Sequence, residues 1–183
     1  GQRHRETSLH VLSPLFAGEV DLPLLQQLAQ RAPVGLDVQG FIRVPVADGL
    51  EFEPWKQMEE GLHSVTYLKV DRAEAEFLTG EADLAKAAAR LHSLGPKEIV
   101  MTESSGVTVS CDGRFYFAPF TPRSLQGRTG RGDTCFSTYI AMRITSDPAI
   151  ACRWAGMVTS LKQEVPGPWQ GTKEQVANLL LTA

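Results

Sequence analysis

Apolar and polar positions along the chain fall into blocks that switch between the period of a strand and the period of a helix. Short apolar runs, typical of buried strands, occupy residues 9–12, 34–37, 65–70 and 97–102. Helical spacing of apolar residues occurs in six segments: 21–28, 72–78, 81–94, 132–144, 148–163 and 172–181. This alternation favours an α/β fold with a mostly parallel sheet.

Local signals define some of these elements more sharply. Asp21 before Leu22-Pro23 predicts a helix start, and the apolar face of that helix is expected to carry leucines 24, 25 and 28. The pair Asp112-Gly113 between two alternating runs predicts a β-hairpin over residues 107–118. Residues 38–54 show no clear period and are expected to be irregular.

Length and composition indicate an ordinary globular chain. The 183 residues fit one domain, and 43% hydrophobic with 21% charged residues argues against disorder. We therefore expect a single domain over 1–183, with residues 1–8 as a polar leader or junction.

Charge and cysteine content exclude several classes of partner. Lys and Arg total 18 against 21 for Asp and Glu, a net charge of −3, which disfavours binding to nucleic acid or to acidic lipid. No apolar run reaches the roughly 20 residues of a membrane-spanning helix. Three widely spaced cysteines suggest neither a disulfide framework nor a zinc site, so a reducing, cytoplasmic location is expected.

The segment Gly127–Thr134, which leads into an apolar, helix-like run, carries the strongest chemical signal. Glycines 130 and 132 allow a tight turn, and a helix that begins there directs unpaired N–H groups and its positive dipole end at one point. This pattern predicts a phosphate site, with Asp133 placed to accept a proton from a substrate hydroxyl. The alternative is that the glycines are loop hinges and that Asp133 only caps a helix.

Polar clusters also follow the predicted strands, at the edge where open α/β sheets bind ligands. They occupy residues 37–43, 69–74, 102–106 and 127–134.

Four sequences within these clusters resemble the C-terminal portion of the ribokinase-like family, also called PfkB-type carbohydrate kinases. They are Asp-Val-Gln-Gly-Phe-Ile-Arg from 37, Lys-Val-Asp-Arg-Ala-Glu-Ala-Glu-Phe-Leu-Thr-Gly from 69, Val-Met-Thr-Glu-Ser-Ser-Gly-Val from 100, and Gly-Arg-Gly-Asp-Thr-Cys-Phe from 130. The resemblance implies a Rossmann-like, three-layer α/β/α fold and an ATP-dependent phosphotransferase. It implies Asp133 as catalytic base, and backbone N–H groups of Gly130, Arg131 and Gly132 as stabilisers of the transferring group.

The same resemblance assigns a metal site and a nucleotide contact. Asp71 and Glu74 match the family's Asn-x-x-Glu element, which helps to organise Mg²⁺. Thr102 and Gly106 match a loop that touches nucleotide, and Lys69 is taken as a further cofactor-binding residue. The alternatives are a capping box at Asp71 and Glu74, and a plain hairpin entry at Thr102.

Some charged residues leave two interpretations open. Arg131 and Arg128 replace the family's usual residues, and their side chains either clamp phosphate or point outward. Asp37 and Arg43 either line the cleft or, as base rates favour, end a strand and pair on the surface.

The family's N-terminal strands and the small β-sheet that covers the acceptor have no counterpart in this sequence. An incomplete sheet would expose an apolar edge, which favours a partner or a homodimer. The leading hypothesis is the catalytic part of a kinase that uses ATP and Mg²⁺ to phosphorylate a sugar, nucleoside or similar small molecule. The alternatives are a non-catalytic nucleotide-binding or regulatory module and an unrelated Rossmann-like binding domain.

Overall fold

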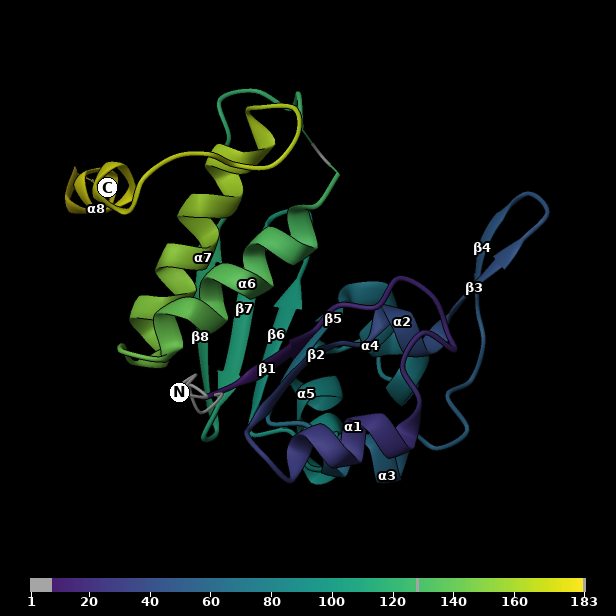
Figure 1. Ribbon diagram of the computed structural model, residues 1–183. Coiled ribbons are helices and arrows are strands. Elements are labelled where there is room, and N and C mark those ends of the chain that lie inside the picture. The colour runs from purple at the N-terminus through teal and green to yellow at the C-terminus, as the bar shows by residue number, and fades with distance from the viewer. Residues whose placement is uncertain (1–7, 128, 183) are drawn as a thin grey trace, which may run out of the picture. The chain divides into compact units, whose positions relative to one another are not determined.

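A computed structural model of the protein describes residues 8–127 and 129–182 (Figure 1). Nearly all of the expected leader, and Arg128, therefore lie outside the described residues. The chain divides into two compact units, and the boundary along the sequence lies between Ile99 and Val100. The expectation of a single domain stays a prediction.

The fold class is α/β, as the sequence pattern predicted, with a mixed and mostly parallel sheet of six strands. The strands of this sheet are β1 (His10–Leu12), β2 (Val34–Asp37), β5 (Tyr67–Asp71), β6 (Glu98–Thr102), β7 (Gly106–Cys111) and β8 (Arg114–Pro119). Strand β2 pairs in parallel with both β1 and β5, whereas β7 and β8 are antiparallel.

The first unit packs its helices around the three parallel strands. These helices are α1 (Leu22–Ala29), α2 (Gln39–Ile42), α3 (Met58–His63), α4 (Arg72–Thr79) and α5 (Leu84–Ser93). The Asp21 side chain caps α1 by accepting a hydrogen bond from Leu24 N at 2.9 Å, as expected. The expected apolar face was wrong in one position, because Leu22 and Leu25 are buried whereas Leu24 is 41% exposed.

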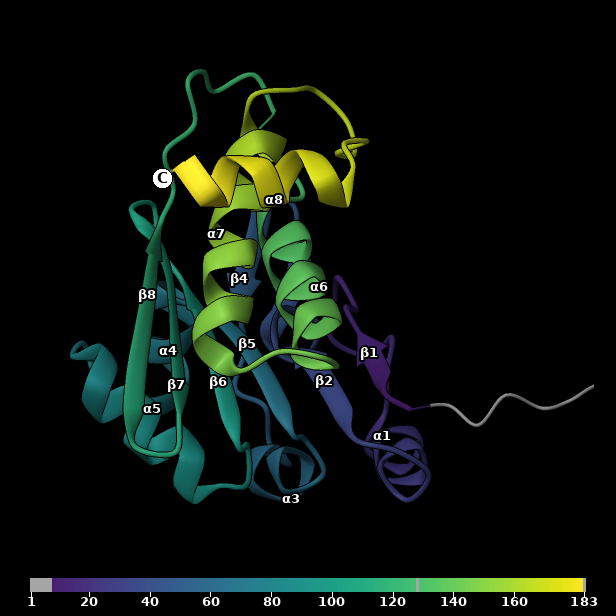
Figure 2. The same ribbon diagram turned by 90° about the vertical axis from the view of Figure 1, so that its left-hand side faces the viewer.

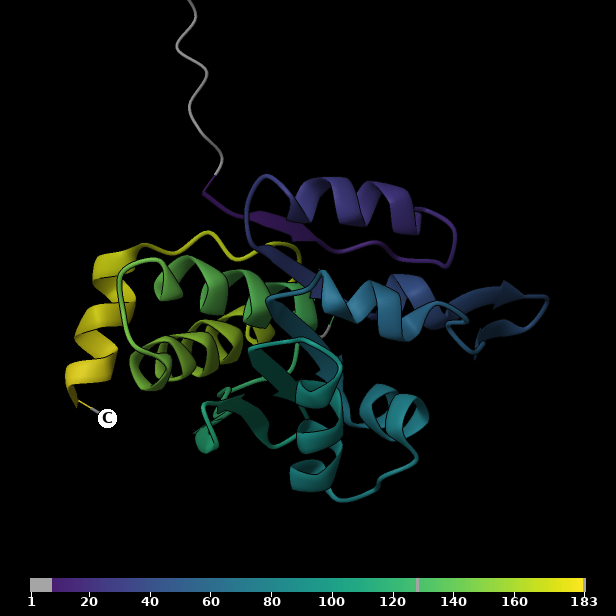
Figure 3. The same ribbon diagram turned by 90° about the horizontal axis from the view of Figure 1, so that it is seen from below.

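The stretch from 38 to 54 is not irregular, which corrects the expectation from the sequence. It contains α2 and a separate antiparallel hairpin of β3 (Arg43–Val46) and β4 (Gly49–Phe52), which extends away from the parallel strands of its unit (Figures 1 and 3). Gly49 has a φ of 146°, a conformation that favours glycine, so Asp48-Gly49 is the turn signal that sequence reasoning overlooked.

The second unit contains the predicted hairpin and three helices, α6 (Arg131–Arg143), α7 (Pro148–Gln163) and α8 (Lys173–Thr182). Asp112 and Gly113 both have positive φ, the geometry of a type I′ turn, which confirms the hairpin. Helices α6 and α7 lie side by side, α7 packs on β7 and β8, and α8 crosses α7 (Figure 2). A Cβ at Gly156 would lie 2.7 Å from Ala118 Cβ, so this glycine allows α7 to approach the hairpin closely.

The segment between β8 and α6 is fixed to the C-terminal turns of α7. Three hydrogen bonds hold it: Thr121 N to Ser160 Oγ, Arg123 N to Glu164 Oε1, and Gly127 N to Gln163 O, each 2.9 Å long. One helix end thus positions the chain that leads into the glycine loop.

The three cysteines are buried and are not joined in disulfide bonds. Burial raises the pKa of the Cys152 thiol to about 12, with a further contribution from Cys135. The Cys152 Sγ lies 3.5 Å from Tyr116 O and 3.7 Å from Val107 O, so it contacts both strands of the hairpin.

Across the described part of the chain, every helix is too short or too polar to span a bilayer.

Candidate active site

The glycine loop has the backbone geometry of an anion site. Helix α6 begins at Arg131, and its N-cap residue Gly130 has a φ of 78°, a left-handed conformation suited to glycine. The first helical hydrogen bond runs from Thr134 N to Gly130 O at 3.0 Å. The N-cap residue Gly130 has no side chain to cap the helix, so the N–H groups of the first turn are available to a ligand.

A cavity of about 510 Å³ adjoins this helix start. It is lined by Gln126, Gly127, Thr129, Gly130, Asp133, Thr134, Lys162 and the loop Pro166-Gly167-Pro168. Asp133 is exposed and lies at the third position of α6, in the first turn. The structure therefore places the Asp133 carboxylate and Gly130 at one cavity, whereas Arg131 and Gly132, the other residues expected to hold a phosphate, are not among its lining residues.

The Arg131 side chain lies over an aromatic ring. Its guanidinium carbon lies 5.8 Å from the centre of the Phe120 ring, a cation–π arrangement. Arg131 is not among the residues that line the cavity, so its side chain is not placed to clamp a phosphate there, and the role of its backbone N–H stays a prediction.

Lys162 is a residue of this site that sequence reasoning missed. It lies in the last turn of α7, is almost fully buried, and lines the cavity. Its Nζ donates a hydrogen bond to Gly127 O at 2.9 Å and lies 3.5 Å from Val165 O. A lysine near a helix C-terminus is an ordinary surface pattern, so nothing in the local sequence indicated this position.

The predicted nucleotide contacts Thr102 and Gly106 are both buried, at the end of β6 and the start of β7. A Cβ at Gly106 would collide with Ala118 O on the paired strand, and Glu103 N donates to Gly106 O at 2.9 Å. A tight hairpin entry, the alternative interpretation, accounts for these contacts. A nucleotide contact at Thr102 or Gly106 stays a prediction.

In the first unit, five ionisable side chains form what we call the charge cluster: Asp37, Arg43, Lys69, Asp71 and Glu74. Lys69 Nζ lies 3.1 Å from Asp37 Oδ2 and 3.5 Å from Glu74 Oε2, and Arg43 Nη2 lies 2.6 Å from Glu74 Oε1. Asp37 and Lys69 are buried, so the expectation that Asp37 merely ends its strand is incomplete. The cluster holds three carboxylates and two cations.

Asp71 and Glu74 form the capping box that the sequence allowed as an alternative. Asp71 Oδ1 accepts from Glu74 N at 2.8 Å, and Glu74 Oε2 accepts from Asp71 N at 2.6 Å. The Glu74 side chain has no exposed surface, whereas 32% of the Asp71 side chain is exposed. Glu74 therefore links the start of α4 to Arg43 and Lys69.

Burial dominates the electrostatics of the cluster at Asp37. It raises the pKa of Asp37 to about 6, although the nearby Lys69 ammonium acts in the opposite direction. For Lys69, burial opposes the charged form, but the carboxylates of Asp37 and Glu74 outweigh it and raise the pKa of the ammonium. Lys69 is thus a fixed cation in ion pairs, and its assignment as a cofactor-binding residue stays a prediction.

The model of the pfkB family of carbohydrate kinases matches residues 5–168, which is most of the chain. The chain belongs to this family. No curated protein matched it.

Solved structures of ribokinase-fold proteins resemble this pfkB-family chain. A pyrophosphate-dependent kinase of the ribokinase family, complexed with a pyrophosphate analog and myo-inositol, is 36% identical with a TM-score of 0.86. The match covers 96% of this chain and 64% of that protein. The sulfate complex of a pyrophosphate-dependent kinase in the same family is also 36% identical, with a TM-score of 0.85 over 96% of this chain and 62% of that one.

Ribokinase of Arabidopsis thaliana, complexed with ribose and ATP, is 23% identical with a TM-score of 0.74 and shows the fold alone. It matches 94% of this chain and 55% of its own. This chain therefore spans less than two thirds of the length of each of these three proteins.

The family resemblance implied Mg²⁺ at Asp71 and Glu74, and the two carboxylates differ in their surroundings. Both oxygens of Glu74 contact donors of the protein, from Arg43, Lys69 and the Asp71 N–H, and the side chain has no exposed surface, so it is poorly placed to coordinate a cation directly. The partly exposed Asp71 carboxylate can bind a water of a hydrated Mg²⁺, which keeps several waters when bound. Among the residues that the structure describes, no group of three His, Cys, Asp or Glu is arranged to hold a metal.

Proposed function

We propose that this protein transfers a phosphoryl group to a hydroxyl of a sugar, polyol or related small molecule. The observation that carries the proposal is the exposed Asp133 carboxylate in the first turn of α6, beside the cavity that the glycine loop lines. In this role Asp133 takes the proton of the acceptor hydroxyl as the new O–P bond forms. The N–H groups of Gly130, Arg131 and Gly132 hold oxygens of the migrating phosphoryl group and stabilise its charge.

For the phosphoryl donor, pyrophosphate is the first candidate. The two structures that are 36% identical to this chain are both of pyrophosphate-dependent kinases. Pyrophosphate needs only an anion site, which the first turn of α6 offers, and the departing group is inorganic phosphate.

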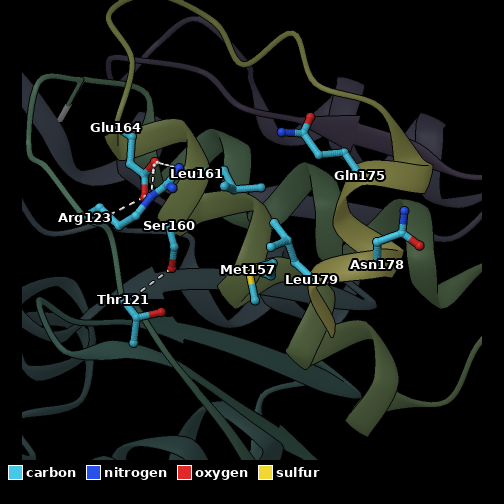
Figure 4. A pocket seen from close by; sticks show the side chains of 9 residues that line it. All are labelled: Thr121, Arg123, Met157, Ser160, Leu161, Glu164, Gln175, Asn178 and Leu179. Atoms are coloured by element: carbon cyan, nitrogen blue, oxygen red, sulfur yellow. Dashed lines mark hydrogen bonds and ion pairs between the residues drawn. The ribbon is translucent and has the colours of Figure 1, made fainter. Parts of the chain in front are cut away.

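ATP, which the sequence led us to expect, is the second candidate, and it needs a pocket for its base as well. A cavity of about 520 Å³ in the same unit offers one (Figure 4). Its lining combines apolar side chains with amides and an ion pair: Met157, Leu161, Leu179, Gln175, Asn178, Thr121, Ser160, Arg123 and Glu164. Arg123 and Glu164 face each other at one end, 2.8 Å apart, and the two amides of α8 lie at the other.

For the acceptor, the sequence led us to expect a sugar or nucleoside, and the structure with myo-inositol adds cyclic polyols. These compounds share adjacent hydroxyl groups, one of which receives the phosphoryl group.

We also propose that Asp71 holds Mg²⁺ through water, that the protein is cytoplasmic, and that an apolar sheet edge supports a homodimer.

The decisive test is a matrix of donors and acceptors. Pyrophosphate or ATP, each with Mg²⁺, is combined with ribose, myo-inositol, fructose or adenosine, and phosphorylated product is measured by mass spectrometry. We expect one donor and one acceptor class to give turnover that the Asp133→Asn variant loses. Tight donor binding without phosphorylation of any acceptor, by this chain and by any longer form of the protein, would favour the non-catalytic binding module instead.

A further inference from the structure

The buried ammonium group of Lys162 lies directly behind the glycine loop. Only 3% of this residue is exposed, and its Nζ is held by two carbonyl oxygens, those of Gly127 and Val165. A Cβ built on Gly130, the N-cap of α6, would have Lys162 Cε as its nearest neighbour at 3.9 Å. The cation is therefore immediately next to the backbone that is expected to hold phosphate.

We propose that Lys162 is the positioning residue of the anion site, a fixed internal cation that sets the shape of the cavity and attracts the donor. The inference rests on the proposed function and deepens it. It assigns to Lys162 two effects, one on the position of the backbone and one on the electrostatic potential in the cavity.

The first effect follows from the two carbonyls that Lys162 joins. Gly127 leads into the glycine loop, and Val165 leads into Pro166-Gly167-Pro168, which lines the same cavity. The two backbones approach so closely that a Cβ at Gly127 would collide with Val165 O. Without the ammonium, the carbonyl oxygens of Gly127 and Val165 would lose the donor that they share, which costs free energy because the Gly127 contact is buried. Lys162 thus fixes the separation of two segments that line the cavity.

The second effect follows from burial. A buried charge is screened by salt much less than a surface charge, so the ammonium adds a lasting positive potential beside the first turn of α6. Lys162 also lies in the last turn of α7, where the negative end of the helix dipole stabilises a cation. The helix end therefore offsets the cost of burying the charge, and the anion site gains from it.

The test measures binding of inorganic pyrophosphate by titration calorimetry, which needs no acceptor and no turnover. Lys162→Met keeps the length of the side chain but removes its charge and donors, and we expect affinity to fall by about ten- to a hundredfold. Lys173→Met is the matched control, because it makes the same substitution and removes the same charge at an exposed position of the same unit, outside both cavities. We expect the control to change affinity by less than about threefold.

A rescue experiment separates the role of the cation from a general role in folding. Lys162→Ala leaves space for a small amine, and we expect propylammonium, but not tetramethylammonium, to restore pyrophosphate affinity in a saturable manner. Wild-type affinity in folded Lys162→Met would overturn the proposal, and so would unfolding of both variants without recovery by the amine. Failure of the wild type to bind pyrophosphate, ATP or phosphate would overturn the anion site itself. Binding that depends on Lys162 but supports no turnover would refute only the proposed function.

Discussion

The charge cluster of the first unit and the glycine loop of the second both match sequence motifs of the family, but they differ in what their polar groups contact. In the cluster, Glu74 is fully buried and each of its oxygens meets a donor of the protein. In the loop, Asp133 is exposed and the first turn of α6 has no side-chain cap. The motif in the charge cluster therefore forms hydrogen bonds and ion pairs within the protein, whereas the motif of the glycine loop forms a site that is open to a ligand.

The difference has a simple physical origin. Charges taken out of water must be paired, so a buried motif uses its carboxylates to hold the fold together. A helix start with a glycine N-cap keeps its N–H groups available, an arrangement that a bound anion completes. Polar groups that can still bind a ligand therefore indicate a functional site more reliably than the closeness of a motif match does.

The largest effect is expected from Asp133→Asn. Loss of a general base should lower kcat by about 10²- to 10⁴-fold, whereas the free energy of unfolding should change by less than about 1 kcal/mol. Asp112→Asn, at an exposed turn of the same unit, is the matched control and should leave kcat unchanged. Steady-state kinetics and thermal unfolding of both variants check this, and normal turnover in Asp133→Asn would rule out the assigned base.

Glu74→Ala should have the opposite profile, because its main effect should be a lower free energy of unfolding. It leaves Arg43 and Lys69 without their shared carboxylate, which costs about 3–5 kcal/mol for a broken buried ion pair. Glu76→Ala, on the exposed face of the same helix, should cost less than about 0.5 kcal/mol. Urea unfolding measures both variants. Wild-type stability together with weakened Mg²⁺ binding in Glu74→Ala would show a metal ligand instead of a structural residue.

Gly127→Ala tests whether the loop depends on close backbone approach. The added methyl group would collide with Val165 O and displace one of the two segments, which we expect to cost about 1–3 kcal/mol. At Gly167 the φ of 74° disfavours alanine but leaves open space, so Gly167→Ala should cost only about 1 kcal/mol. Equal melting temperatures of the two variants would mean that backbone conformation, and not close approach, decides the tolerance.

The charge cluster should also make stability depend on pH. Because the pKa of Asp37 is about 6 in the fold and about 4 in the unfolded chain, the unfolded state ionises first as pH rises. Asp37 therefore lowers stability progressively between about pH 4 and pH 6, by about 3 kcal/mol in total. We expect the stability of wild type relative to Asp37→Asn to fall over this interval, while Asp48→Asn, at an exposed hairpin turn, shows no such trend. A constant difference would indicate that Lys69 keeps Asp37 ionised throughout.

The sequence predicted those parts of the fold that local signals determine. Asp112-Gly113 specifies its hairpin through two positive φ angles, and Asp21 caps α1 through a contact three residues away. The hairpin within 38–54 was missed because its strands are short and one contains Pro45, although Asp48-Gly49 marks its turn.

The sequence predicted only those parts of the candidate site whose residues are neighbours along the chain. The glycine loop and Asp133 are neighbours along the chain, so their association could be inferred directly. Lys162 contacts Gly127 across 35 positions, and Lys69 contacts Asp37 across 32. Contacts of this range depend on how strands and helices pack, which local patterns do not encode.

The burial of Cys152 between α7 and the β7–β8 hairpin makes that thiol an internal reporter. With a pKa near 12, almost none of it is thiolate at neutral pH, and the thiolate is the form that alkylating reagents attack. Labelling must therefore wait until the helix separates from the strands, and its rate in the native protein measures how often that separation occurs.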